Sequence, residues 1–157
     1  MVKSIIFDYR EFPINKGGDR GKLSSKKPLI ELASKEYSNR AVHCLVDSGA
    51  DSSISFKSVG ETFFGLKFSE KDRIPNNISG LHTCPNFNCE QHPHKAPLYL
   101  KPIIFKVGNK DITLNVRWMD RGFNPDEDFL FILGRDFFVY FDILFKQTDE
   151  KFCLYTK

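Results

Sequence analysis

The chain has 157 residues, 41% of them hydrophobic, which is the composition of a globular protein long enough to bury a core within one domain. Its formal net charge of +3 is too small to indicate a nucleic-acid partner. No apolar run is long enough to span a membrane, and the charges within residues 7–11 exclude a signal-peptide core. We therefore expect a cytoplasmic protein without nucleic-acid or membrane partners, whose four cysteines are reduced.

The first third of the chain alternates short apolar runs with turn-forming residues. Residues 4–9 favour a β-strand, and residues 15–27 are rich in glycine, serine and charges, which is typical of a mobile loop. We therefore treat residues 1–26 as an N-terminal strand followed by a loop. Two further apolar runs, at 28–33 and 41–46, predict a hairpin.

The rest of the chain also favours strands over helices. Residues 56–66 predict a short helix, and residues 67–77 are polar and irregular. Residues 129–133 are apolar on both faces, which predicts a central, buried strand. Two hairpins and a second short helix complete the expected elements, at 103–107 with 112–118, 143–145 with 152–155, and 137–141. The expected class is therefore mainly β.

The composition also indicates what fills the core. Sixteen phenylalanines and a single tryptophan predict a core made largely of phenylalanine. Cys44 and Cys153 stand on strand-like runs, so we expect them to be buried thiols.

A carboxylate stands where the apolar run 41–46 ends. Asp47 is followed by Ser48 and Gly49, and Asp-Ser-Gly is a good turn sequence in any protein. Here the preceding run places the carboxylate at the edge of a core. A second buried run ends in a similar way at Gly134, roughly eighty residues later.

These two motifs, Val-Asp-Ser-Gly-Ala-Asp at 46–51 and Ile-Leu-Gly-Arg-Asp at 132–136, resemble those of the retropepsins, the single-domain aspartic proteases of retroviral type. The resemblance covers roughly residues 27–155 and indicates a protease domain over 27–157. It implies a mainly β fold, a closed acid-protease-type β-barrel with one short C-terminal helix. It also implies an active site formed across a homodimer.

The resemblance makes Asp47 the catalytic aspartate. The chemistry needs two carboxyls that share a proton, a behaviour for which aspartic proteases are the standard example. Asp19 and Asp120 are each followed by an arginine, and neither is expected to follow an apolar strand. The second aspartate is therefore expected from a second copy of the chain.

The resemblance also implies roles for the neighbouring residues. Ser48 is expected to hydrogen-bond across the dimer axis, and Gly49 to let the backbone approach a bound peptide. Asp51 and Arg135 are expected to form a buried ion pair, whose loss of one partner would cost about 3–5 kcal/mol. The residues expected to support the site are Ala50, Asp51, Gly134, Arg135 and Asp136.

A flap over the active site is expected at approximately residues 78–98. It contains a Cys-x4-Cys-x2-His-x-His pattern, whose four candidate ligands for a structural Zn²⁺ are Cys84, Cys89, His92 and His94. This spacing is not one of the well-attested zinc-finger spacings. A polar loop with free thiols and a reversible disulfide between the two cysteines are the other interpretations.

The leading hypothesis is a homodimeric aspartic endopeptidase that needs no cofactor for catalysis. Its partners are a second copy of itself and a protein or peptide substrate, which pairs with the enzyme as an added strand. The alternative is a catalytically silent retropepsin-fold dimer that acts as a peptide-binding or zinc-stabilised interaction module.

Overall fold

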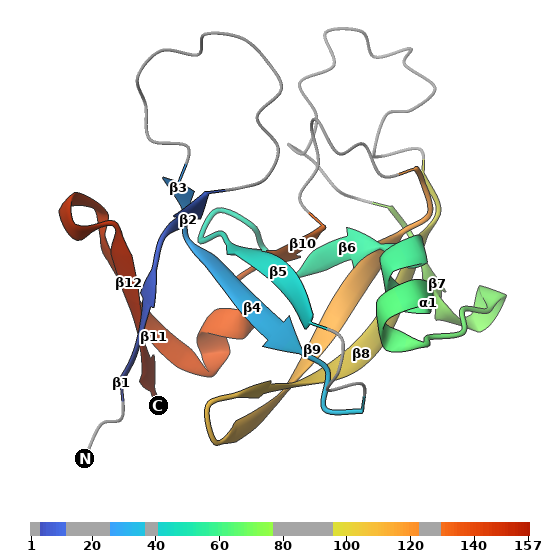
Figure 1. Cartoon of the computed structure of the whole chain (residues 1–157). Coiled ribbons are helices and arrows are strands. Elements are labelled where there is room, and N and C mark those ends of the chain that lie inside the picture. The colour runs from blue at the N-terminus through green and yellow to red at the C-terminus, as the bar shows by residue number, and fades with distance from the viewer. Residues whose placement is uncertain (1–3, 12–25, 37–40, 77–95, 123–129) are drawn as a thin grey trace, which may run out of the picture.

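The computed structural model describes residues 4–11, 26–36, 41–76, 96–122 and 130–157 (Figure 1). The described strands are β1 (Ser4–Asp8), β2 (Arg10–Glu11), β3 (Lys26–Lys27), β4 (Leu29–Ala33), β5 (Ala41–Val46), β6 (Ile54–Phe56), β7 (Arg73–Ile74), β8 (Leu98–Val107), β9 (Lys110–Met119), β10 (Phe131–Leu133), β11 (Phe141–Lys146) and β12 (Lys151–Thr156). The described helices are α1 (Lys57–Phe64) and three 3-10 turns, at Glu70–Asp72, Phe137–Val139 and Gln147–Asp149. The mainly β class is confirmed.

A seven-stranded sheet forms the body of the molecule, in the order β4-β5-β10-β6-β9-β8-β7. Strand β10 is an inner strand, parallel to β5 on one side and antiparallel to β6 on the other. All three of its residues are buried, so both faces of this apolar strand are covered, and its two neighbours pair both of its edges. The central strand expected at residues 129–133 is confirmed, as are the two hairpins β4–β5 and β8–β9.

The edge strand β4 meets β8, the strand next to the last in the sheet order, at one described point. Ser34, just beyond β4, forms an isolated antiparallel bridge with Phe105 of β8, and the Lys35 N–H donates to the Ile104 carbonyl at 2.9 Å. The described strands therefore form an open ladder with a bridging contact, and a closed barrel is not present among them.

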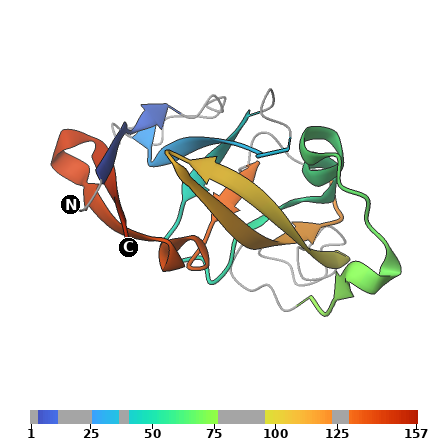
Figure 2. The same ribbon diagram turned by 90° about the horizontal axis from the view of Figure 1, so that it is seen from below.

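A second sheet, in the order β1-β12-β11, joins the first strand of the chain to the last two (Figure 1). We call it the terminal sheet. In both views it lies at one end of the molecule and α1 lies at the other (Figure 2). One of its faces packs aromatic rings together, with the Phe7 and Phe152 centroids 5.0 Å apart. The last hairpin is confirmed, whereas the β1–β12 pairing joins residues too distant in sequence for any local pattern to predict.

The helices differ from expectation near the C-terminus. The helix expected at residues 56–66 is confirmed as α1, which ends at Gly65 in the left-handed conformation at φ 60°. The short helix expected at 137–141 is present only as the 3-10 turn Phe137–Val139, because the chain enters β11 at Phe141. Aromatic and β-branched residues fill this stretch and are poor helix formers, and burial of Phe137 and Phe141 sets its course.

The segment after α1 is also more regular than its polar sequence indicates. Residues 67–77 were expected to be irregular, but they contain the 3-10 turn Glu70–Asp72 and the edge strand β7. A two-residue strand is too short to show an alternating pattern in sequence.

Aromatic side chains fill the core between the large sheet and α1. The rings of Phe64, Phe105, Phe131 and Trp118 contact one another with centroids 5.6–6.3 Å apart. Both cysteines that the structure describes, Cys44 and Cys153, are buried free thiols as expected. Burial raises the pKa of the Cys44 thiol well above its usual value. None of the described helices is long and apolar enough to cross a membrane.

Candidate active site

The two sequence motifs lie side by side where the neighbouring strands β5 and β10 of the large sheet end. Strands β5 and β10 run parallel with Val46 opposite Leu133, so both strands end at the same level. The Asp47 N–H then donates to the Leu133 carbonyl at 3.0 Å. The parallel pairing therefore brings together two loops that are far apart in the sequence.

Asp47 sits in a tight turn of its own making. Its Oδ1 accepts a hydrogen bond from the Gly49 N–H at 2.9 Å, and its carbonyl accepts one from the Ala50 N–H at 3.3 Å. This is the local side-chain turn that aspartate favours. Asp47 is half-buried while Ser48 and Gly49 are exposed, so the carboxylate is anchored at one oxygen and open to the surface.

Gly134 is required by the close approach of the two loops. A Cβ at this position would lie 2.5 Å from the Ser52 carbonyl carbon and 2.8 Å from the Ala50 oxygen, both of them backbone atoms. Next to it, the Arg135 N–H donates to the Ala50 carbonyl at 2.9 Å. Only glycine fits here, because the opposing backbone cannot move without breaking the contacts that hold the turn.

A buried serine and a carboxylate lock the loops together. Asp136 Oδ1 accepts from the Ser53 N–H at 2.8 Å, from the Ser53 hydroxyl at 2.7 Å and from the Phe137 N–H at 3.1 Å. The Ser53 hydroxyl in turn accepts from the Gly134 N–H at 3.2 Å. Ser53 had no expected role from the sequence, and its full burial is what requires these hydrogen-bond partners.

Known proteins resemble this chain in structure rather than in sequence. No protein-family model matches the chain, and no curated protein matches its sequence. Among solved structures, the chain is similar to a retropepsin-like aspartic protease from Rickettsia conorii, with a TM-score of 0.58, 16% identity, and coverage of 99% of this chain and 92% of that one. The fold of the chain is retropepsin-like.

Two other solved structures align less closely with this retropepsin-like chain. A retroviral protease-like domain from Leishmania major matches with a TM-score of 0.44 and 12% identity, over 78% of this chain and 82% of that one. A Legionella pneumophila protein of unknown function matches with a TM-score of 0.39 and 16% identity, over 72% and 84%. At these identities the similarity concerns the fold alone.

The ion pair expected between Asp51 and Arg135 is present but exposed. Arg135 Nη1 lies 3.3 Å from Asp51 Oδ1, and the two side chains are 66% and 83% exposed. The expectation of a buried pair is therefore wrong for the single chain. Within the described part of the chain, most of the surface of both side chains is open to solvent.

Asp120 was rejected as the second catalytic aspartate partly because it was not expected to follow an apolar strand, and that expectation is wrong. It directly follows β9, so it does follow an apolar strand. Its carboxylate is nevertheless paired, with Oδ2 2.8 Å from Lys57 Nζ. The hydrogen bond from Lys57 to Asp120 raises the pKa of that ammonium. Asp120 therefore belongs to a surface ion pair, and Asp19 lies outside the described residues.

The flap and its four candidate zinc ligands, Cys84, Cys89, His92 and His94, lie outside the described residues. A structural zinc there stays a prediction. Within the described part of the chain, no cluster of three or more His, Cys, Asp or Glu side chains is arranged to hold a metal.

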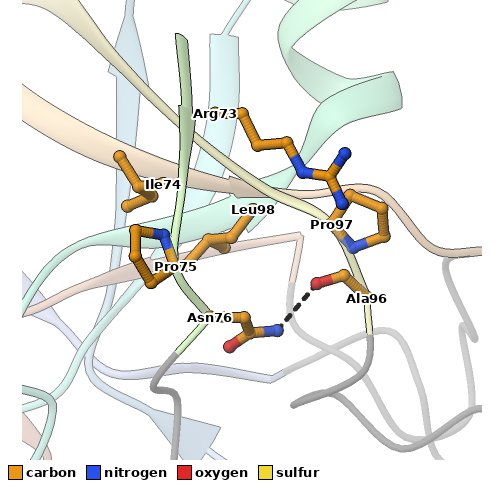
Figure 3. A pocket seen from close by; sticks show the side chains of 7 residues that line it. All are labelled: Arg73, Ile74, Pro75, Asn76, Ala96, Pro97 and Leu98. Carbon is orange, nitrogen blue, oxygen red and sulfur yellow. Dashed lines mark hydrogen bonds between the residues drawn. The ribbon is translucent and has the colours of Figure 1, made fainter. Parts of the chain in front are cut away.

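A pocket of about 490 Å³ lies where β7 and β8 stop pairing (Figure 3). The Asn76 side chain donates to the Ala96 carbonyl at 2.8 Å and joins the two walls. The described residues that line the pocket include no carboxylate and no nucleophilic side chain. Its lining residues are Arg73, Ile74, Pro75, Asn76, Ala96, Pro97 and Leu98.

Proposed function

We propose that the chain is an aspartic endopeptidase that acts as a homodimer, with one Asp47 from each subunit forming the catalytic pair. The observation that carries the proposal is the position of Asp47. Its carboxylate is held by the Gly49 N–H in a turn that is hydrogen-bonded to the end of the central strand β10. The retropepsin-like fold also supports the proposal of an aspartic endopeptidase.

The need for two subunits follows from the chemistry. Two close carboxyls share one proton because both cannot ionise cheaply, and the pair therefore titrates as a unit. Among the described residues, the two other carboxylates of these loops already have partners, Asp51 in its ion pair with Arg135 and Asp136 in its hydrogen bonds from Ser53. A second Asp47 is the partner that completes the pair.

The proposed reaction passes one proton from water to the leaving nitrogen through this pair. The protonated carboxyl donates a hydrogen bond to the carbonyl oxygen of the peptide bond, and the ionised carboxylate takes a proton from a water molecule. The water oxygen attacks the carbonyl carbon and forms a tetrahedral intermediate. The carbon–nitrogen bond then breaks as the leaving nitrogen takes a proton from the pair.

The residues around Asp47 have supporting roles in this proposal. Gly49 carries no side chain, so the substrate backbone can approach the carboxylate. Ser48 is exposed next to Asp47, in a position suited to a hydrogen bond across the dimer axis. The exposed pair of Asp51 and Arg135 is suited to be covered by the partner subunit.

The test is cleavage of casein and of a peptide library by the wild-type chain and by Asp47→Asn. We expect new amino termini with the wild type and a loss of at least about a thousandfold with the variant. Asp149→Asn, which alters an exposed aspartate in the turn Gln147–Asp149, is the matched control and is expected to keep full activity.

Equal turnover by wild type and Asp47→Asn would remove Asp47 from the mechanism. A wild-type dimer that retains peptides without producing new termini would instead identify the peptide-binding module that was the alternative from the sequence.

A further inference from the structure

The walls of the pocket where β7 and β8 stop pairing are tied together at both ends. The ladder pair Ile74 and Leu98 joins them at one end, and the Asn76 side chain donates to the Ala96 carbonyl at 2.8 Å at the other. The volume of about 490 Å³ lies within the range of sites that hold small ligands. Because both ends are tied, the pocket favours a ligand that ends inside it over a chain that runs between the walls.

This pocket and the two motif loops are built from different parts of the sheet. Strand β7 is the last strand in the order of the large sheet, and β6, β9 and β8 lie between it and β10. The described residues that line the pocket include none from the motifs at 46–51 and 132–136. Binding in the pocket therefore does not use the residues of the Asp47 turn.

The guanidinium of Arg73 gives the pocket a positive charge. Its side chain reaches from β7 toward Pro97 on the opposite wall (Figure 3). Arg73 Nη1 lies 3.4 Å from Glu70 Oε2, and the two side chains are 52% and 77% exposed. An ion pair with this exposure is worth little, and a guanidinium has five N–H donors. Arg73 can therefore bind a second carboxylate in the two-point geometry that arginine and carboxylates favour.

The backbone of the walls offers little to a peptide that continues on both sides of the pocket. Pro75 and Pro97 have no N–H to donate. The Pro97 carbonyl already accepts from the Asp120 N–H at 2.8 Å, and the Ala96 carbonyl accepts the hydrogen bond that joins the walls. Unpaired backbone groups of a bound chain cost free energy. The last residue of a peptide brings one N–H and a carboxylate, and the carboxylate can pair with Arg73.

The remaining side chains favour an apolar group beside that carboxylate. Leu98 is buried, and Ile74 and Pro97 are half-buried. An apolar side chain placed against them would remove apolar surface of both partners from water. The apolar lining residues are Ile74, Pro75, Ala96, Pro97 and Leu98.

We propose that this pocket binds the C-terminal residue of a peptide, with its carboxylate on Arg73 and its apolar side chain against the walls. The inference goes beyond the proposed function and does not rest on it, since the pocket shares no residue with the Asp47 turn. Hydrolysis of a peptide bond creates a new C-terminal carboxylate. The fragments of a cleaved protein therefore carry the group that this pocket recognises.

The experiment measures the binding of a fluorescent pentapeptide by fluorescence anisotropy. The peptide ends in leucine and has a free carboxylate, and every chain carries Asp47→Asn so that cleavage does not consume the probe. We expect saturable binding, and binding about tenfold weaker when the same peptide ends in an amide. A free acid that ends in glycine should bind about fivefold more weakly than the one that ends in leucine.

Two variants at exposed positions should act in opposite directions. Arg73→Gln removes the cation and should weaken binding of the free acid about tenfold, to the level of the amide. Glu70→Gln removes the competing carboxylate and should strengthen binding about twofold. Arg10→Gln is the matched control, because Arg10 Nη1 also lies 3.4 Å from a glutamate oxygen and its side chain is also 52% exposed. It changes the net charge equally and should leave the dissociation constant unchanged.

Each part of the inference has a result that would overturn it. Equal binding of the free acid and the amide, or equal losses in Arg73→Gln and Arg10→Gln, would remove Arg73 from the site. An amidated peptide with an internal aspartate that binds as well as the free acid would overturn the choice of a C-terminal residue. Equal binding of the leucine and glycine peptides would remove the apolar walls.

Absence of saturable binding up to about 1 mM peptide would overturn the pocket as a peptide site. None of these results bears on the cleavage test of Asp47→Asn, so the proposed function and this inference can fail separately.

Discussion

Two hydrogen bonds join Ser53 to Asp136 at the point where the two motif loops meet. The Ser53 N–H and hydroxyl both donate to Asp136 Oδ1, at 2.8 and 2.7 Å, and the same hydroxyl accepts from the Gly134 N–H. Ser53 is fully buried, so water cannot replace these partners. The pair therefore fixes the segment after Asp47 against the segment after β10.

Removal of the Ser53 hydroxyl should destabilise the chain. Ser53→Ala leaves the buried Gly134 N–H without its acceptor and takes one donor from the Asp136 carboxylate. We expect the free energy of unfolding to fall by about 1–3 kcal/mol, measured by urea denaturation. Ser52→Ala, at the half-buried neighbour, is the control and should change it by less than about 0.5 kcal/mol. Equal losses in the two variants would show that the hydroxyl contacts contribute nothing specific.

A methyl group at Gly134 should be costly for a different reason. Its Cβ would overlap backbone atoms of Ser52, the nearest at 2.5 Å, so either the Asp47 turn or the end of β10 must move. Gly134→Ala should lower the free energy of unfolding by about 3 kcal/mol or more. Thermal and urea unfolding check this expectation. Gly122→Ala is the control, because a Cβ there meets nothing within 4 Å.

Much of this architecture could be predicted from local sequence. The apolar run before Asp47 and the uniformly apolar run before Gly134 identify two buried strands, and their parallel pairing brings the motifs together. Gly65 correctly marks the end of α1, since glycine readily adopts the left-handed conformation.

The rest depended on contacts that local patterns do not contain. The role of Ser53 depends on its 2.7 Å hydrogen bond to Asp136. The two residues are 83 positions apart in the sequence, so no local pattern predicts this contact. The run Phe137–Val139 was expected to begin a helix, but burial of Phe137 against Phe141 outweighs any local preference. The terminal sheet pairs β1 with β12, strands from opposite ends of the sequence, so only tertiary structure reveals it.

The acid side of the stability profile should depend on Asp72. Its Oδ2 accepts from the Ser69 N–H at 2.8 Å and from the Ser69 hydroxyl at 3.0 Å, and Lys101 Nζ lies 3.4 Å away. The backbone hydrogen bond from Ser69 is the main cause that lowers the pKa of Asp72 below its usual 3.8.

The sign of this effect follows from linkage. A carboxyl whose pKa is lower in the folded state stabilises the fold above its unfolded pKa, and the contribution is lost as the pH falls through the folded pKa. Asp72→Ala should therefore be less stable than the wild type at neutral pH, and the difference should shrink below the usual pKa of 3.8. Urea midpoints measured between about pH 7 and pH 2 test this. Asp149→Ala is the control, and a gap that stays constant down to the lowest pH would contradict the expectation.

The ion pair of Asp51 and Arg135 should report on dimer formation. In the single chain both side chains are exposed, so a double-mutant cycle with Asp51→Asn and Arg135→Met should give a coupling below about 1 kcal/mol. If the partner subunit covers the pair, desolvation makes loss of one partner expensive, at about 3–5 kcal/mol. The cycle is therefore measured twice, by urea unfolding of the monomer at low concentration and by the dimer dissociation constant. A coupling that is small in both measurements would place Asp51 and Arg135 outside the dimer interface.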